Sequence, residues 1–441
     1  MKKQIKVIPR TLPGFMELKP NEQILFNQIK ENIEESYKRF GFLPLDTPIL
    51  ELSEVLLAKA GGETEKQIYR FTRGDDLAMR FDLTVPLAKY VSKNYGELQF
   101  PFRRYQIGKV YRGERPQKGR FREFYQADID IIGDGELSIM NDAEIPSIIY
   151  TTFKNLGFDD FTIRINNRKI LNGLFEYLNI VELSTEIMRI IDKLEKIGKE
   201  NVKLELLKLN IKEEIVDKIL EFISISGNNE EKIEALEKLN IKNEVFEKGL
   251  FELKEVVKYI RLFGVPEGNF SIDLTIARGL DYYTGTVYET FLDNYREIGS
   301  VCSGGRYDNL AENYTDKSLP GVGIAIGVTR LFDQLNDLKL IKTEKESISD
   351  VLVISTSDDV SECLPIANTF RKEGINTEVY MNDKKMKAKF KYADKLKIPY
   401  VAIIGEDELK ENKVSLKNLV TGKQDTINIQ EAVEILKEYN K

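Results

Sequence analysis

The sequence predicts an α+β protein with a helical insertion and a separate C-terminal α/β domain. Three observations predict it. Residues 101–132 have the pattern of two strands joined by a loop, residues 182–260 have helical spacing, and residues 350–441 alternate between strand and helix patterns. A chain of 441 residues usually divides into two or three domains, which agrees with this arrangement.

The predicted strand pair is strongly basic. Its first strand runs through Tyr105, its loop lies near 113–119, and its second strand ends at Ile132. Residues 101–126 hold eight basic and two acidic side chains, a net charge of +6, whereas the whole chain carries −7. Arginine forks bind phosphate oxygens through paired hydrogen bonds, so the segment indicates a phosphate site. A solvated basic hairpin is the alternative, and the aromatic residues between the arginines argue against it.

The helical insertion lies in a stretch without proline, between 147 and 265. Apolar residues recur there at spacings of three and four, as on one face of a helix, and Ser226–Asn229 has the composition of a loop. The predicted apolar faces contain Ile191, Leu194, Ile197, Leu204, Leu206, Leu207, Leu209, Ile215, Ile219 and Phe222. We interpret this stretch as a module inserted into a larger domain. Its role, core packing or contact with a substrate, stays open.

The C-terminal domain follows a polar segment at 342–347. Buried-strand patterns at 350–355 and 400–405 flank a helical pattern at 362–373 and a lysine-rich helix, which is typical of a small α/β domain.

Two glycine-rich segments lie upstream of this boundary. Ser303–Asp308 has the composition of a turn, and 320–330 reads as a strand that runs into a helix bearing Arg330. The glycine spacing at 320–330 differs from the GxGxxG of dinucleotide-binding turns, so we exclude that interpretation.

The composition excludes several mechanisms, because the chain contains no histidine and only two cysteines, Cys302 and Cys363. A histidine relay, an imidazole base, a histidine-ligated metal and a structural zinc site are therefore excluded. No apolar run of about eighteen residues and no apolar leader occurs, so we expect no membrane span and a cytoplasmic location.

Several segments make the sequence resemble the class II aminoacyl-tRNA synthetases, and among them the histidyl-tRNA synthetases. Residues 41–48 (GFLPLDTP), 105–132 and 320–330 resemble motifs 1, 2 and 3 of the class. Residues 277–289 (ARGLDYYTGTVYE) resemble the segment particular to the histidyl enzymes, and 79–86 (MRFDLTVP) also matches. The resemblance covers nearly the whole chain.

The resemblance implies a fold and an activity. The fold is an antiparallel-sheet catalytic domain in two parts, 1–170 and 263–340, with a helical insertion at 171–262 and an anticodon-binding domain at 348–441. The activity is that of a histidine–tRNA ligase, which joins L-histidine to ATP as histidyl-adenylate and transfers it to histidine tRNA.

The resemblance also implies the ATP site. Arg112 would hold the α-phosphate, Arg330 the γ-phosphate, and Arg278 would bridge the α-phosphate and the histidine carboxylate. Glu114, Arg120 and Phe124 would complete the site, with the Phe124 ring stacked on adenine. Mg²⁺ would be carried by the phosphates, so few metal ligands from the protein are expected.

A histidine pocket needs partners for two ring nitrogens, which a carboxylate and a phenol can supply. The resemblance implies Asp130 and Tyr283 for the ring. It implies Asp82, Thr84 and Gln126 for the α-amino group, with Tyr282 and Arg278 completing the set.

For tRNA, the resemblance places Arg115 and Gln117 at the acceptor end, and motif 1 implies a homodimer. Residues 381–397 contain seven lysines and two aspartates, a net charge of +5, which suits anticodon binding. A solvated lysine-rich helix face is the alternative.

Two alternative functions share this resemblance. One is a synthetase-like regulatory subunit of histidine biosynthesis that charges no tRNA, and the other is a degenerate sensor of uncharged tRNA. The C-terminal domain and Arg112, Arg278 and Arg330 argue against the first, and Asp130 and Tyr283 against the second. Gly113 and Asn167 stand where relatives often have histidine, and neither is needed for the roles above. Drift in composition remains one explanation of the absence of histidine.

Overall fold

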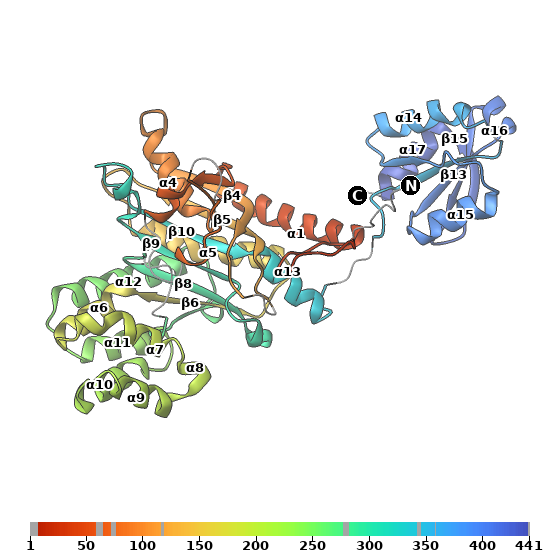
Figure 1. The fold of residues 1–441 in the computed structure, drawn as a ribbon. Helices are drawn as coiled ribbons and strands as arrows, with labels where there is room; N and C mark the ends of the chain where they lie inside the picture. The colour runs from red at the N-terminus through yellow and green to blue at the C-terminus, as the bar shows by residue number, and fades with distance from the viewer. Residues whose placement is uncertain are drawn as a thin grey trace. The chain divides into compact units, whose positions relative to one another are not determined.

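The computed structural model describes residues 8–58, 65–71, 76–115, 119–276, 282–341, 345–357 and 359–439. The chain divides into two compact units (Figure 1). The first contains the residues up to 16 and 29–340, and the second contains 17–28 and the residues from 341 onward. Within the described parts of the chain, no helix combines the length and the apolar character that a membrane crossing requires.

The described residues of the first unit are built on an eight-stranded sheet. In spatial order its strands are β1 (Leu43–Pro44), β4 (Phe102–Tyr111), β5 (Glu123–Ile132), β10 (Gly321–Gly327), β9 (Cys302–Tyr307), β8 (Thr286–Leu292), β6 (Phe161–Asn167) and β7 (Phe270–Ile272). The two outermost pairs, β1 with β4 and β6 with β7, are parallel, and all other neighbours are antiparallel. The predicted antiparallel catalytic sheet is confirmed.

The predicted basic strand pair is β4 and β5. In its register Arg104 lies opposite Asp130, Gln106 opposite Asp128, and Gly108 opposite Gln126. Because side chains alternate between the two faces of a strand, these positions share one face of the sheet. The register therefore gathers a row of polar side chains in the interior.

The prediction of a turn at Ser303–Asp308 is wrong, since Cys302–Tyr307 form strand β9 between β8 and β10. A Cβ atom on Gly304 would lie 2.1 Å from the Gly323 carbonyl oxygen of β10. The glycine is thus needed for close approach of two strands, and not for a turn.

Helices and a small second sheet complete the first unit outside the insertion. They are α2 (Ser53–Leu57), α4 (Thr84–Lys93), α5 (Met140–Asn155), α13 (Val328–Asp337), the part of α1 (Pro20–Arg39) that follows residue 28, and the antiparallel strands β2 (Leu50–Leu52) and β3 (Leu77–Met79). Short 3-10 turns outside the insertion are η1 (Tyr95–Glu97), η3 (Glu267–Asn269), η4 (Asp293–Ile298) and η5 (Leu310–Asn313), and η2 (Val181–Leu183) lies within it.

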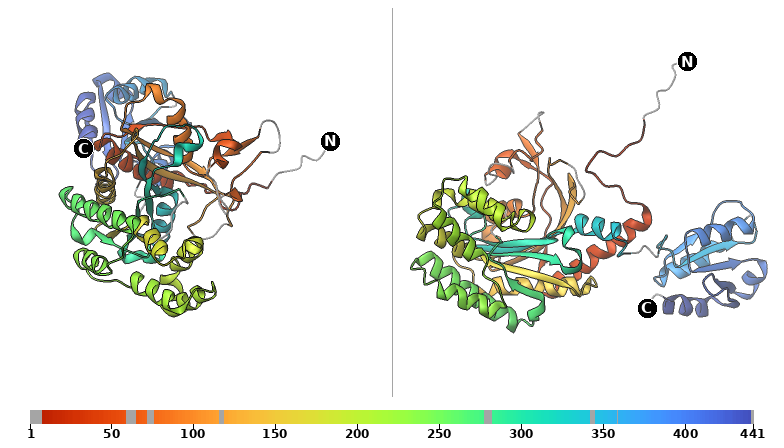
Figure 2. Two further views of the ribbon diagram at one scale, coloured as in Figure 1. Left: turned by 90° about the vertical axis from the view of Figure 1, so that its left-hand side faces the viewer. Right: turned by 90° about the horizontal axis from the view of Figure 1, so that it is seen from below.

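The part of the proline-free stretch that follows β6 is helical, as predicted for 182–260. Its helices are α6 (Arg168–Tyr177), α7 (Ser184–Ile191), α8 (Leu194–Ile197), α9 (Lys199–Leu207), α10 (Glu213–Ile223), α11 (Asn229–Lys238) and α12 (Glu244–Leu262). Figure 2 shows them gathered together in yellow-green and green. The predicted loop ends where Asn228 and Glu231 cap α11 reciprocally. Leu204 is 57% exposed, contrary to the predicted face, because Val202 and Leu206 take the buried positions of α9.

The second unit has the predicted α/β organisation. Its described residues form a five-stranded sheet in the order β12 (Thr377–Val379), β11 (Val351–Ser355), β13 (Tyr400–Ile404), β14 (Lys413–Asn418) and β15 (Gln424–Asn428). The first three strands are parallel, and β14 and β15 are antiparallel. Its helices are η6 (Ser361–Cys363), α14 (Leu364–Lys372), α15 (Met386–Lys395), α16 (Glu406–Glu411) and α17 (Ile429–Tyr439).

Candidate active site

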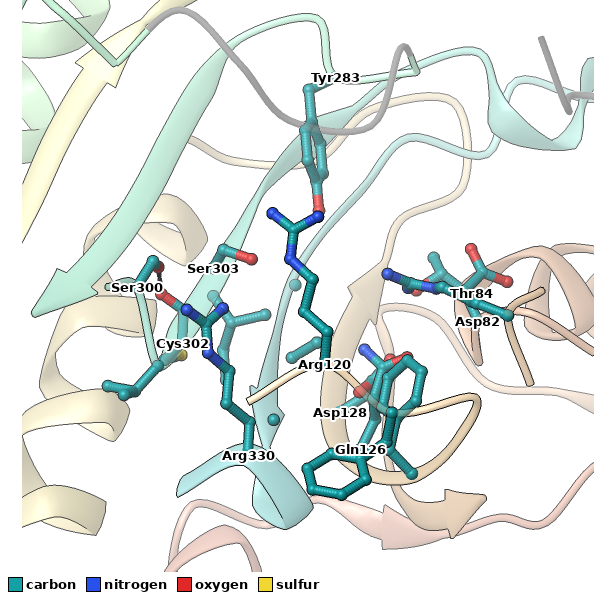
Figure 3. Close-up of a pocket in the computed structure, with 18 of the residues that line it drawn as sticks. Asp82, Thr84, Arg120, Gln126, Asp128, Tyr283, Ser300, Cys302, Ser303 and Arg330 are labelled. Atoms are coloured by element: carbon teal, nitrogen blue, oxygen red, sulfur yellow. Dashed lines mark hydrogen bonds between the residues drawn. The ribbon is translucent and has the colours of Figure 1, made fainter. Parts of the chain in front are cut away.

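A cavity of about 530 Å³ lies in the first unit, against strands β5, β9 and β10 (Figure 3). Eleven of the predicted site residues line it: Asp82, Thr84, Arg112, Glu114, Arg120, Phe124, Gln126, Asp130, Tyr282, Tyr283 and Arg330. Arg115 is exposed and does not line the cavity. Arg278 and Gln117 lie outside the described residues.

Arginines gather in one part of the cavity. Arg112, just past the end of β4, donates from Nε to the Phe81 carbonyl oxygen at 3.0 Å, and its guanidinium lies 5.1 Å from the centre of the Phe124 ring. These two contacts hold the guanidinium beside an aromatic face, a geometry that suits arginine.

Arg330 lies in the first turn of α13, directly after β10. Its Nη2 donates to the Ile298 carbonyl oxygen, and its buried Nε has no partner among the described residues. Burial, together with the nearby Arg120, lowers the pKa of Arg330. Figure 3 shows Arg120 and Arg330 extending together into the cavity. Glu114 Oε2 lies 3.5 Å from Arg120 Nη1, so these cations are only partly compensated and can receive an anionic group.

Asp82 stands at the start of helix α4. Its Oδ1 accepts a hydrogen bond from the Val85 backbone N–H at 3.1 Å, and its Oδ2 lies 3.5 Å from the Tyr282 hydroxyl. Burial raises the pKa of the Asp82 carboxyl to about 6. A carboxyl group in this position can bind a cationic amine, because the positive charge of the amine would favour the ionised form of the carboxyl.

Asp130 is buried in the middle of β5. One of its oxygens accepts a hydrogen bond, and the other lies in an ion pair but has no hydrogen-bond partner among the described residues. Arg104 Nη2 lies 2.7 Å from Oδ2, and the Tyr307 hydroxyl donates to Oδ1 at 2.6 Å. Burial raises the pKa of this carboxyl, and Arg104 opposes the rise. Glycine at 323 leaves the room that this carboxyl needs, since a Cβ atom there would lie 2.4 Å from Asp130 Oδ1.

Three tyrosines pack together over this carboxylate-rich part of the cavity. The ring of Tyr282 lies 5.0 Å from that of Tyr283 and 5.9 Å from that of Tyr307, both edge to face. Burial raises the pKa of all three phenols, so they stay protonated and can donate hydrogen bonds.

Sequence reasoning missed several polar residues of the cavity, among them Gln67, Asp128 and Tyr307. A period of two along β5 could have found Asp128, since it lies between Gln126 and Asp130 on the same face. Tyr307 could not have been found in this way, because its segment was interpreted as a turn.

The lysine-rich segment of the second unit is largely exposed. Six of its lysines, at 384, 385, 387, 391, 395 and 397, are exposed. Lys389 is the exception: it is 5% exposed, and its Nζ donates to the Ser355 carbonyl oxygen at 2.8 Å. It therefore helps to hold α15 against the end of β11 and does not belong to a surface for RNA.

An antiparallel sheet, with arginines and an acidic, tyrosine-lined pocket on one face, defines a class II aminoacyl-tRNA synthetase. Comparisons with known proteins give the family. The sequence model of histidyl-tRNA synthetase matches residues 14–331, and that of the anticodon binding domain matches 350–439. The chain belongs to the histidyl-tRNA synthetase family.

Individual relatives agree over nearly the full length. The histidine–tRNA ligase of Clostridium tetani is 61% identical over 99% of this chain and 100% of its own. That of Finegoldia magna is 51% identical over 97% of this chain and 99% of its own. The crystal structure of histidyl-tRNA synthetase from Nostoc sp. PCC 7120 superposes with a TM-score of 0.89 at 39% identity, covering 98% of this chain and 100% of that chain.

Proposed function

We propose that this protein is a histidine–tRNA ligase. It activates L-histidine with ATP to histidyl-adenylate and then transfers the histidyl group to the 3′ end of histidine tRNA. The main support for this proposal is that one cavity contains both cationic arginines and a part lined by carboxylates and tyrosines, in a chain of this family. The regulatory-subunit alternative is less supported, because relatives similar over the whole chain bear the name of the ligase.

The arginines of the cavity would bind ATP. The reaction is attack of the histidine carboxylate on the α-phosphate with loss of pyrophosphate, and its main requirement is neutralisation of negative charge. Arg112 would face the α-phosphate and Arg330 the terminal phosphate, while adenine would stack on Phe124. Arg120 and Glu114 would complete this part. Arg112 and Arg330 would act by their charge and would transfer no proton, so the reaction needs no histidine side chain of the protein.

The carboxylates and tyrosines would bind histidine. Asp82, Thr84 and Gln126 would receive the α-ammonium group, and the burial of Asp82 makes its charge available to a cation instead of to water. Asp130 and Tyr283 would face the ring, with Tyr282 beside them. Arg278 would bind the histidine carboxylate, an assignment that stands on the sequence alone.

Other partners belong to the same proposal. Mg²⁺ would arrive with the ATP phosphates. Arg115, with Gln117, would contact the acceptor end of tRNA, and the exposed lysines of 384–397 would contact the anticodon arm. Leu43 and Leu50 are exposed, near motif 1, and would be covered in a homodimer. A cytoplasmic location follows from this activity.

The test is amino-acid-dependent exchange between ATP and pyrophosphate with the purified full chain, followed by charging of histidine tRNA. We expect exchange with L-histidine and none with the other standard amino acids, and we expect aminoacylation of histidine tRNA. Absence of exchange at every histidine concentration would refute the enzyme. Exchange without charging would refute only the transfer step.

A further inference from the structure

Asp128 is a buried carboxylate of the cavity to which the foregoing proposal gives no role. It lies on β5 between Gln126 and Asp130, lines the cavity and is 2% exposed. Its Oδ1 is buried and has no hydrogen-bond partner among the described residues. Figure 3 shows Asp128 beside Gln126 on the cavity wall.

The carboxylates around Asp128 are engaged by protein groups. Asp130 has Arg104 on one oxygen and Tyr307 on the other, and Asp82 accepts from the Val85 N–H. In the described structure, Arg104 forms its ion pair with Asp130 and none with Asp128. Asp130 Oδ2 also lacks a hydrogen-bond partner, but it has the Arg104 cation beside it. Asp128 differs from Asp130 and Asp82 because its carboxyl group has neither an ion pair nor a hydrogen bond among the described residues.

Leaving such an oxygen without a partner is costly. A buried acceptor that loses its hydrogen bonds to water without gaining others is destabilising, and native proteins rarely keep one. The charged groups that face Asp128 are Arg104 and Arg112, which oppose Asp82 and Asp130. A cavity wall with this surplus of acceptors suits a ligand that presents N–H groups.

Histidine presents N–H groups on its ammonium and on its ring. The ring needs an acceptor, and the one proposed for it, Asp130, already accepts from Tyr307 and pairs with Arg104. Asp128 is the next residue of the strand on the same face. We propose that Asp128 accepts a hydrogen bond from a ring N–H of the bound amino acid and thereby helps to select histidine. This inference rests on the proposed function.

The first test is Asp128→Asn, which keeps the shape of the side chain and replaces one carboxyl oxygen by an N–H donor. In histidine-dependent ATP–pyrophosphate exchange we expect the KM for histidine to rise about 10-fold, the size expected for one lost hydrogen bond. The KM for ATP should stay within about twofold of the wild type, because Asp128 does not face the nucleotide in this proposal. Asp316→Asn removes an exposed carboxylate and serves as the matched control, with no change expected in either constant.

The second test separates contact with the ring from a structural role. Thiazol-4-ylalanine and thiazol-5-ylalanine each replace one ring nitrogen of histidine by sulfur and keep the other. The wild type should discriminate against at least one of them, and Asp128→Asn should lose about tenfold or more of that discrimination. A residue that only supports the cavity would weaken all three amino acids alike.

Three results would overturn the inference: an unchanged KM for histidine, an equal loss for histidine and both thiazoles, or a KM for ATP that rises as much as that for histidine. The last result would mean that Asp128 shapes the whole site. A wild-type protein without histidine-dependent exchange would instead refute the proposed function, so the two failures are distinguishable.

Discussion

Arg104 provides the most direct test of how the carboxylate part of the cavity is held together. Its side chain is 0% exposed, its Nη2 lies 2.7 Å from Asp130 Oδ2, and the same nitrogen donates to the Leu83 carbonyl oxygen at 2.9 Å. Arg104→Met keeps most of the aliphatic stem and removes the guanidinium. The substitution leaves the buried Asp130 without its cation and Leu83 without its donor.

The expected cost is large because breaking a buried ion pair by removing one partner leaves an uncompensated charge. We expect Arg104→Met to lower the free energy of unfolding by about 3–5 kcal/mol. Domains of 150–250 residues lose roughly 2–4 °C per kcal/mol, and the larger first unit should lie near the lower end, so the melting temperature should fall by about 6–10 °C.

The assay is calorimetry of the full chain, with Asp130→Asn and the double variant measured beside Arg104→Met. In the double variant the buried charge is gone, so at least about half of the loss should be recovered, while the Tyr307 hydroxyl can still donate to the amide oxygen of the new side chain. Recovery should be partial because Arg104 also faces Asp128. A loss below about 1 kcal/mol in Arg104→Met, or a double variant as unstable as the single one, would refute the reasoning.

Two further predictions concern the same cavity. Gly323→Ala should destabilise the protein by about 1–3 kcal/mol and raise the KM for histidine. The reason is that the new Cβ atom would lie 2.3 Å from the Ile129 carbonyl oxygen and 2.4 Å from Asp130 Oδ1. Chemical unfolding measures the stability and exchange kinetics measure the KM, and wild-type values in both would contradict the packing described. Burial raises the pKa of Asp82 from 3.8 to about 6, so the folded state keeps this proton longer than the unfolded chain and stability should decrease as pH rises from about 4 to about 6. Asp82→Asn keeps an acceptor for the Val85 N–H and should remove up to roughly 3 kcal/mol of that decrease in stability. Melting curves across this pH range measure the effect. If stability fell with pH at the same slope in the variant and the wild type, Asp82 would not titrate in this range.

Local patterns in the sequence predicted most of the fold and much of the candidate site. The spacing of apolar residues and the positions of glycine and proline predicted the strand pair β4 and β5, the helical insertion and the α/β organisation of the second unit. These patterns depend on residues that are near neighbours in the sequence. The resemblance to the family supplied eleven residues that line one cavity. The absence of histidine, visible from composition alone, limited the chemistry to carboxylates, arginine, lysine, tyrosine, backbone groups and bound Mg²⁺.

The tertiary structure decided what each buried polar group contacts. Asp130 and Tyr307 are 177 positions apart in the sequence, and they meet because β9, β10 and β5 are neighbours in the sheet. The same strand order explains why Ser303–Asp308, turn-like in composition, lies largely in a strand. Gly304 is required by the close approach of the β10 backbone, and not by a turn in its own segment. Likewise Lys389, one of a run of lysines, is buried because α15 turns that position toward β11. Composition and periodicity carry no information about such partners, since burial and pairing depend on which distant segments the fold brings within a few ångströms.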